Sequence, residues 1–215
     1  MSKNNNIQEF LSFINALKGF MDHEEGMCLN KYASKSSEYG PILEIGSYCG
    51  KSTVYMGLGI KGKNSCIYSI DHHMGSEENQ VGWEYHDAEL FDKETGKINS
   101  FPEFMRNLRK ANLLDTVIPI VSDSSLVSRD WKIPLSMVFI DGGHTMEAAF
   151  NDFNNWKDKI IKGGILAIHD VFPNPDDGGR PPFEIYRKAL SENNFKEVEA
   201  VKSLRILEKL NETII

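Results

Sequence analysis

The stretch PILEIGSYCGKST, residues 41–53, joins a short apolar run to a glycine-rich turn. Runs that are apolar at nearly every position belong to strands covered on both faces, as in a parallel sheet with helices above and below. Gly46 and Gly50 follow the run at the point where the chain has to turn sharply into the next element. We therefore expect a buried parallel strand that leads through a glycine loop into a helix.

Further apolar runs repeat this pattern along the chain. They are CIYSID at 66–71, SMVFID at 136–141, GILAIHD at 164–170 and the weaker VIPIV at 117–121. Pro119 cannot donate a hydrogen bond to a neighbouring strand, so the weaker run fits best at an edge of the sheet. Apolar residues at helical spacing separate the runs, over 7–20, 102–113, 146–160 and near 183–192. Lys162-Gly163-Gly164 is typical of a helix end and predicts where the helix over 146–160 stops.

The alternation of strands and helices predicts an α/β fold with a doubly wound, mostly parallel sheet. The pattern changes after the last parallel run. FKEVEAV at 195–201 and LRILEK at 204–209 are separated only by Lys202-Ser203. Two such runs with a two-residue connection predict an antiparallel hairpin that closes the sheet.

Composition limits the function classes. The 215 residues are enough for one domain with one core. Lysine and arginine number 24 against 31 aspartates and glutamates, and the net charge of −7 opposes binding to nucleic acid or to an anionic membrane. No stretch approaches the about 20 apolar residues of a membrane helix, and MSKNNNIQEF at the N-terminus is unlike a signal peptide. Cys28, Cys49 and Cys66 fit reduced thiols, so we expect a cytoplasmic protein with no nucleic acid and no membrane as partner.

Three nucleotide-binding motifs compete for the loop at 44–53. A Walker A loop requires four residues before its Gly-Lys-Ser, but only three separate Gly46 from Gly50. A dinucleotide fingerprint requires a second glycine where Tyr48 stands, and the bulk of this side chain would obstruct a pyrophosphate. The pattern that remains is acid-x-Gly-x-x-x-Gly, beginning at Glu44.

This pattern resembles motif I of class I S-adenosylmethionine-dependent methyltransferases. The resemblance is closest to small O-methyltransferases, both the catechol type and the bacterial family that includes macrolide-sugar O-methyltransferases and proteins linked to cephalosporin biosynthesis. GSYCGKST, IDGGHTMEAAFNDFNNW and GGILAIHDV carry it, and it extends over residues 25–208. It implies a seven-stranded sheet of order 3-2-1-4-5-7-6 with helices on both faces and the C-terminal antiparallel hairpin.

The resemblance also implies one methyltransferase domain over residues 1–215, with N-terminal helices in 1–38. The long connections 72–99 and 171–182 leave the carboxyl ends of predicted strands, where open α/β sheets bind ligands. We therefore predict that both lie on the substrate side. The helix over 7–20 has one apolar stripe that would serve its own sheet or a second copy of the chain equally well, so a homo-oligomer stays open.

S-adenosylmethionine is the cofactor that the resemblance implies. Glu44 would offer a carboxylate to its ammonium group, Asp71 would accept its ribose hydroxyls, and Asp123 or Ser124 would contact its adenine amino group. Taken alone, Glu44 could be a half-buried glutamate behind a glycine turn, Asp71 could cap a turn, and 122–124 could be a plain turn. The predicted cofactor-binding residues are Glu44, Gly46, Ser47, Tyr48, Gly50, Ser52, Asp71, His72, Asp123, Ser124 and Asp141.

Asp141 and Asp170 end two of the predicted strands, and equivalent carboxylates hold a divalent cation in the families that the chain resembles. The resemblance implies Mg²⁺ or Mn²⁺, with His169 as the third ligand or as a partner of the ligands. Relatives commonly have Asp-Asp or Asp-Asn where this chain has His169-Asp170, and an imidazole suits manganese, iron or zinc better than magnesium. Adjacent strand residues point to opposite faces, so His169 could instead point into a helix layer.

The predicted catalytic residues are His144 and Asp141. His144 lies three residues beyond Asp141, where the catechol-type relatives have a catalytic lysine. An imidazole with a pKa of about 6.5 is a competent base at neutral pH. The competing interpretation makes Thr145 the N-cap of the next helix, with His144 merely preceding it in solvent.

Together, the residues and the resemblance predict an S-adenosylmethionine-dependent O-methyltransferase that acts on a small hydroxylated molecule, with assistance from a divalent metal. A second hypothesis is a non-catalytic S-adenosylmethionine-binding protein, in which His169 marks lost chemistry. A third is a metal-dependent oxygenase with ferrous iron among Asp141, His144, His169 and Asp170. Metal binding and product formation separate the first two, and an oxygen-dependent product would mark the third.

Overall fold

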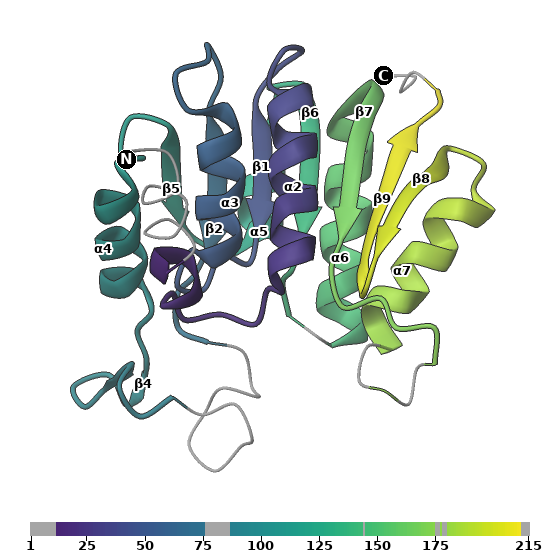
Figure 1. Ribbon diagram of the computed structural model, residues 1–215. Helices are drawn as coiled ribbons and strands as arrows, with labels where there is room; N and C mark the ends of the chain where they lie inside the picture. Colours follow the sequence, from purple (N-terminus) through teal and green to yellow (C-terminus); the bar gives the residue numbers. More distant parts are fainter. Residues whose placement is uncertain (1–11, 76–86, 144, 175–176, 178–179, 212–215) are drawn as a thin grey trace.

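A computed structural model describes residues 12–75, 87–143, 145–174, 177 and 180–211 of the chain (Figure 1). Seven strands form one sheet in the order β5-β2-β1-β6-β7-β9-β8. The strands are β1 (Ile42–Ile45), β2 (Ile67–Asp71), β5 (Val117–Val121), β6 (Leu135–Ile140), β7 (Ile160–Ile168), β8 (Phe195–Val201) and β9 (Leu204–Lys209). Counted among the strands of this sheet alone, the order is the predicted 3-2-1-4-5-7-6.

The register places β1 at the centre of the parallel part of the sheet. It pairs in parallel with β2 on one side and with β6 on the other, and Glu44 lies opposite Ser69. β9 is antiparallel to both β7 and β8, which confirms the hairpin predicted over 195–201 and 204–209. β5, which contains Pro119, is an edge strand, as expected for a residue without an N–H.

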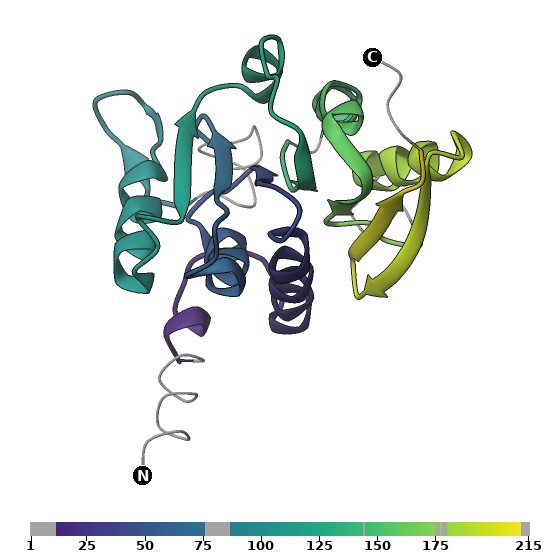
Figure 2. The same ribbon diagram turned by 90° about the horizontal axis from the view of Figure 1, so that it is seen from above.

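Helices cover both faces of the sheet (Figure 2). On one face lie α2 (His23–Ser36), α3 (Lys51–Ile60) and α4 (Phe101–Ala111), and on the other α5 (Ser124–Ser128), α6 (Met146–Trp156), the short η2 (Lys157–Lys159) and α7 (Arg180–Ser191). A hydrophobic core lies on each face of the sheet, and successive residues of β1 point into opposite cores. Ile42 packs with α2, α3 and α4, while Leu43 and Ile45 pack with α6 and α7. The fold is the predicted doubly wound α/β sheet. Among the described residues, no helix is long and apolar enough to cross a bilayer.

The predicted helix over 146–160 is wrong at its C-terminal end. α6 stops at Trp156, and β7 already begins at Ile160, which pairs with Leu135 of β6. A register shift follows this pair, and Gly163, with a φ of 73°, lies in β7 and does not end a helix. The reason is that the fully packed Ile160 suits a buried strand position as well as the apolar stripe of α6.

The predicted helix over 7–20 is also shorter than expected. In its described part, helical structure stops at residue 15, and turns and bends follow. Ile14 and Leu17 of the predicted stripe are buried, as expected. The stripe residues Ile7, Phe10 and Leu11 lie outside the described residues.

The two long connections leave the sheet at the carboxyl ends of β2 and β7, at the lower edge in Figure 1. The connection over 72–99 contains a small antiparallel hairpin, β3 (Phe91–Asp92) and β4 (Lys97–Ile98), that the sequence did not predict. Residues 76–86 of this connection lie outside the described part. The predicted substrate side of the sheet is therefore the edge at which the parallel strands end.

Replacing Gly26 with alanine should destabilise the fold, although alanine favours helices. A Cβ atom at this position in α2 would lie 2.3 Å from the buried Tyr55 ring of α3, so the two helices would have to move apart. We expect the free energy of unfolding to fall by about 1 to 3 kcal/mol in urea titrations. Met27→Ala, on the exposed side of the same helix, should change it by less than about 0.5 kcal/mol. A gain in stability for Gly26→Ala would show that helix propensity outweighs this contact.

Candidate functional site

The glycine loop leaves β1 at the carboxyl edge of the sheet and touches the end of β6. Gly46, Tyr48 and Gly50 have positive φ angles of 85°, 47° and 86°. A Cβ atom added to Gly46 would lie 2.0 Å from the carbonyl oxygen of Asp141, so no side chain fits at this position. The contact places the predicted cofactor loop directly beside the first residue of the predicted metal site.

Glu44, the acid of the motif, lies behind the loop. Its carboxyl group is 0% exposed and accepts hydrogen bonds from the hydroxyls of Ser52 (2.6 Å), Thr53 (2.5 Å) and Ser69 (2.7 Å). Burial raises the pKa of this carboxyl group to about 7, although the three hydroxyls act in the opposite direction. This geometry gives both oxygens of Glu44 partners within the protein, so the predicted contact with a cofactor ammonium has no support from the described residues and stays a prediction. The buried Ser52 hydroxyl is likewise directed at Glu44 and not into the loop.

Asp71 fixes the backbone of the loop. Its Oδ2 accepts hydrogen bonds from the N–H groups of Ser47 (3.0 Å) and Tyr48 (2.7 Å), and its Oδ1 accepts one from the N–H of His73 (2.7 Å). The turn-capping role that the sequence left open is therefore confirmed. The carboxylate keeps 14% exposure, so a ribose contact at the same side chain stays a prediction.

The two histidines after β2 differ in their surroundings. His72, the predicted cofactor contact, is exposed. His73 is buried, its Nδ1 lies 2.9 Å from Oγ of Ser100, and its ring packs against two phenylalanine rings of α4. Burial lowers the pKa of the His73 imidazole, which favours a neutral ring. His73 therefore anchors the start of the connection to α4, a role that the sequence did not reveal.

Asp123 and Ser124 are bound to helices. Oδ1 of Asp123 accepts hydrogen bonds from the N–H groups of Ser125 (2.9 Å) and Leu126 (3.1 Å) and so caps α5. The hydroxyl of the buried Ser124 donates to Asp152 of α6. The two residues are thus the N-cap and the first residue of a helix and not a plain turn, and their predicted contacts with adenine stay predictions.

The structure brings together the three residues predicted to bind a metal. Ligand atoms of Asp141, His169 and Asp170 lie within 4.8 Å of one another. Nδ1 of His169 is 3.0 Å from Oδ1 of Asp141 and 3.4 Å from Oδ1 of Asp170. β7 ends at Ile168 and Asp170 has a φ of 57°, so the alternation of strand side chains does not separate the last two residues of this cluster.

The other nitrogen of His169 faces Glu25, a residue of α2 that the sequence analysis did not select. Nε2 lies 3.1 Å from Oε2 of Glu25, and both side chains are only 4% exposed. The alternative in which His169 points into a helix layer is thus also realised, because one ring spans from α2 to the carboxylate cluster. The only sequence signal at Glu25 is a capping box with Asp22, which accounts for this glutamate without any site.

Three carboxyl groups surround one imidazole in this buried corner. Burial alone lowers the pKa of the His169 imidazole, but the charge and hydrogen bond of Asp141, together with Glu25 and Asp170, raise it well above its usual value. Burial alone raises the pKa of the Glu25 carboxyl group, but His169 and Ser203 lower it to about 2. The corner therefore favours a positive charge at Nδ1 of His169, from a proton or from a cation.

His144, the predicted base, lies outside the described residues. The next residue, Thr145, is the N-cap of α6, and its hydroxyl oxygen accepts a hydrogen bond from the N–H of Ala148 at 3.2 Å. The capping role of Thr145 is therefore confirmed, and the base role of His144 stays a prediction.

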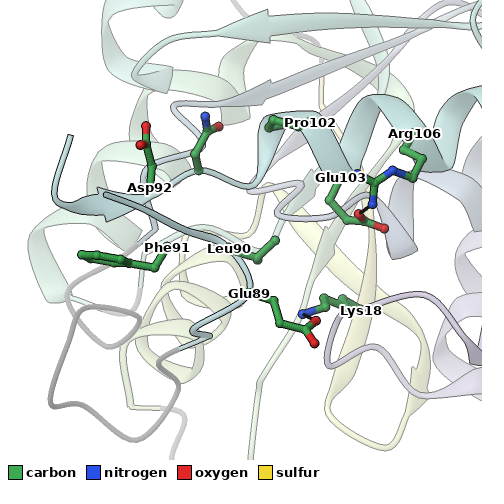
Figure 3. Close-up of a pocket in the computed structure, with 9 residues that line it drawn as sticks. Lys18, Glu89, Leu90, Phe91, Asp92, Pro102, Glu103 and Arg106 are labelled. Atoms are coloured by element: carbon green, nitrogen blue, oxygen red, sulfur yellow. Dashed lines mark hydrogen bonds and ion pairs between the residues drawn. The ribbon is translucent and has the colours of Figure 1, made fainter. Parts of the chain in front are cut away.

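A pocket of about 290 Å³ lies between the N-terminal segment, the residues around β3 and the start of α4 (Figure 3). Its walls include the ion pair of Lys18 with Glu89 (2.6 Å), the pair of Arg106 with Glu103, and the apolar Leu90. None of its lining residues is a predicted site residue. We therefore assign it to neither the glycine loop nor the carboxylate cluster.

Comparison with known proteins gives a family match over the site. A family model described as a methyltransferase domain matches residues 43–171. This span begins in β1 and ends directly after Asp170, so it contains the glycine loop, Asp71 and the carboxylate cluster, but not Glu25.

Solved structures share the fold over most of the chain. Cofactor-bound Rv0187 from MTB has a TM-score of 0.66 and 13% identity, covering 95% of this chain and 90% of that one. The O-methyltransferase NovP has a TM-score of 0.65 and 15% identity, covering 87% and 79%. An O-methyltransferase from Bacillus cereus in complex with SAH has a TM-score of 0.63 and 16% identity, covering 97% and 93%. At these identities the likeness establishes a shared fold.

Replacing Glu44 with glutamine should remove a pH-dependent loss of stability. The pKa of about 7 in the folded protein lies above the ordinary 4.5, so the folded protein keeps a proton that the unfolded chain releases as the pH rises from 4.5 to 7. At about 1.4 kcal/mol for each pKa unit, the wild-type free energy of unfolding should fall by about 3 kcal/mol over this interval. In urea unfolding at several pH values, this fall in stability should be about 3 kcal/mol smaller in Glu44→Gln than in the wild type and in Glu38→Gln, an exposed control, because Asp152 and His169, whose pKa values are also raised, keep their contributions in all three proteins. Equal slopes in all three proteins would contradict the raised pKa.

Proposed function

Because the chain belongs to the methyltransferase domain family and is an S-adenosylmethionine-dependent methyltransferase, we propose that it methylates a hydroxyl oxygen of a small molecule. The observation that carries the proposal is the contact of Gly46 with Asp141. It sets the loop for the cofactor against a cluster of carboxylates and an imidazole that can act on a hydroxyl group. The O-methyltransferases among the proteins of the same fold support oxygen as the acceptor atom.

The glycine loop is suited to hold the cofactor. S-adenosylmethionine supplies a methyl group on a positively charged sulfur. Oγ of Ser47 is buried and has no hydrogen-bond partner among the described residues, which is unfavourable until a polar ligand atom meets it. The contacts that we propose are Gly46, Ser47, Tyr48, Gly50, Asp71, His72 and Asp141, because Glu44, Ser52, Asp123 and Ser124 already have partners within the protein.

Asp141, Asp170 and Nδ1 of His169 are the groups that would hold a divalent cation. They fit one, because their ligand atoms converge in a corner that favours added positive charge. A bound cation would lower the pKa of an acceptor hydroxyl. A donor set with one nitrogen suits Mn²⁺ better than Mg²⁺.

Methyl transfer also requires that the acceptor oxygen lie in line with the methyl group and lose its proton. Asp141 contacts the loop through its backbone and the cluster through its side chain, so it fixes the position of one reacting partner relative to the other. His144, three residues further along, is our candidate for the group that accepts the proton.

The described residues do not favour the oxygenase hypothesis. The described part of the cluster has one imidazole and two carboxylates, and His144, the second histidine that an iron site with two histidines and one carboxylate would use, lies outside the described residues. The non-catalytic hypothesis would give cofactor binding without methylated product. We further propose a small acceptor in preference to a nucleic acid, because the net charge is −7, and a reducing compartment such as the cytoplasm, because the cysteines are free thiols.

Isothermal titration calorimetry should show that S-adenosylmethionine and S-adenosylhomocysteine bind with micromolar dissociation constants, or about −8 kcal/mol. NAD and ATP should not bind, because the loop lacks their motifs. The same preparation with Mn²⁺ and a panel of small hydroxylated acceptors should then release S-adenosylhomocysteine. If neither adenosyl ligand binds, with or without metal, the assignment of the loop is wrong. Binding without product across the panel would favour the non-catalytic hypothesis.

Replacing Asp71 with asparagine should weaken S-adenosylmethionine binding by about tenfold or more, or about 1.4 kcal/mol. Asparagine has only one accepting oxygen, so its NH₂ group has to face either the Ser47 and Tyr48 N–H groups or the His73 N–H, and in both orientations the loop loses part of what fixes its shape. Asp123→Asn is the matched variant, since asparagine is as good an N-cap as aspartate, and its affinity should stay near the wild-type value. A loss as large in Asp123→Asn would support the predicted contact of Asp123 with adenine.

A further inference from the structure

The hydrogen on Nε2 of His169 is fixed by the surroundings of Glu25. Oε1 of Glu25 accepts hydrogen bonds from the N–H of Ser203 (2.8 Å), the hydroxyl of Ser203 (2.8 Å) and the N–H of Leu204 (3.2 Å). Oε2 faces the N–H of Asp22 (3.3 Å) and Nε2 of His169 (3.1 Å). A carboxylate that accepts from this many donors has only lone pairs to offer, so Nε2 must donate.

This donor fixes the other end of the ring. In a neutral imidazole one nitrogen donates and the other accepts. With one hydrogen on Nε2, Nδ1 lies 3.0 Å from Oδ1 of Asp141 and 3.4 Å from Oδ1 of Asp170 and holds the second proton of the imidazolium, which the carboxylates stabilise. A metal ion that displaces this proton meets three electron-rich atoms, the lone pair of Nδ1 and the two carboxylate oxygens.

We propose that Glu25 is a positioning residue for a metal site: it holds the Nε2 hydrogen of His169, so that Nδ1 becomes a ligand beside Asp141 and Asp170 and the site prefers Mn²⁺ to Mg²⁺. The inference rests on the metal-assisted methyl transfer proposed above. Metal-binding histidines generally donate their second N–H to a carboxylate or carbonyl, which orients the ring.

Glu25 is rigidly placed for this role. It lies in the first turn of α2, where it completes the capping box with Asp22, and its Oε1 is held by the turn between β8 and β9. The carboxylate and the imidazole are both buried, so water does not compete for either group. The orientation of His169 is therefore set by three elements that meet at one carboxylate.

Glu25→Gln tests the inference because it should reverse the ring's hydrogen bonding. The Ser203 and Leu204 donors would keep the amide oxygen, which leaves the amide NH₂ to face Nε2. Nε2 would then accept, the hydrogen would move to Nδ1, and Nδ1 would no longer be a ligand. Mn²⁺ affinity, measured on metal-free protein by electron paramagnetic resonance of unbound Mn²⁺, should fall by roughly 10- to 100-fold. The affinity for Mg²⁺, measured by adding Mg²⁺ as a competitor, should fall less than the affinity for Mn²⁺, so the preference for Mn²⁺ should become smaller.

The matched control is Glu24→Gln, which makes the same chemical change at an exposed position of the same helix turn and should keep the wild-type affinity. Nitrogen-15 NMR of the imidazole, recorded above its raised pKa so that the ring is neutral, should show hydrogen on Nε2 in the wild type and on Nδ1 in Glu25→Gln, a change that a merely structural role would not produce. If Glu25→Gln does not fold, His169→Asn serves instead. Its amide can face Glu25 and offer oxygen to the metal, so the preference should move toward Mg²⁺.

Calorimetry with S-adenosylmethionine on the same samples separates the two levels of the argument. Wild-type protein that binds the cofactor but no Mn²⁺ overturns this inference and the metal assistance, and leaves the methyltransferase assignment standing. A Glu25→Gln variant with wild-type Mn²⁺ affinity and hydrogen still on Nε2 overturns this inference alone. Protein that binds neither adenosyl ligand overturns the proposed function. The inference is supported if the wild type binds one equivalent of Mn²⁺ and if Glu25→Gln loses both this binding and the hydrogen on Nε2.

Discussion

The close approach of Gly46 to the backbone of Asp141 is the constraint on which the site depends. β1 and β6 are neighbouring parallel strands, so the loops that follow them leave the sheet at the same edge. The carbonyl oxygen of Asp141 occupies the space of a side chain at Gly46, and the positive φ of this residue also favours glycine. The glycine therefore does more than let the chain turn, because it fixes the spacing between the cofactor loop and the carboxylate cluster.

Behind the loop, a buried carboxyl group joins the first turn of α3 to β2. Gly50 is the N-cap of α3 and has no side chain to accept a hydrogen bond. Glu44 accepts hydrogen bonds from the hydroxyls of Ser52 and Thr53 in the first turn of α3 and from the hydroxyl of Ser69 in β2. An ionised carboxylate in this position would be unfavourable, and the raised pKa favours the neutral form. A neutral carboxyl group can hold three hydroxyls together without placing a charge in the core.

The strands and their order were predictable because buried parallel strands leave apolar runs, and the resemblance supplied the order. The start of β7 was not predictable, because the apolar Ile160 fits both the apolar stripe of α6 and a strand position paired with Leu135 of β6. The site shows a related limit. Sequence position placed Asp141 and Asp170 correctly at the sheet edge, since strand ends meet there. It could not show that Glu44 faces inward, because the hydroxyls that occupy it come from other elements.

Glu25 was beyond sequence reasoning for a physical reason. Its contact with His169 joins residues 144 positions apart, and the local capping box with Asp22 already explains a glutamate there. Only in the folded chain does one carboxylate serve the start of α2, the turn at Ser203 and the imidazole together. The antiparallel hairpin that closes the sheet thereby reaches the site. His169 and, after it, the turn at Ser203 lower the pKa of Glu25, and the ionised Glu25 can accept a hydrogen bond from Nε2 of His169.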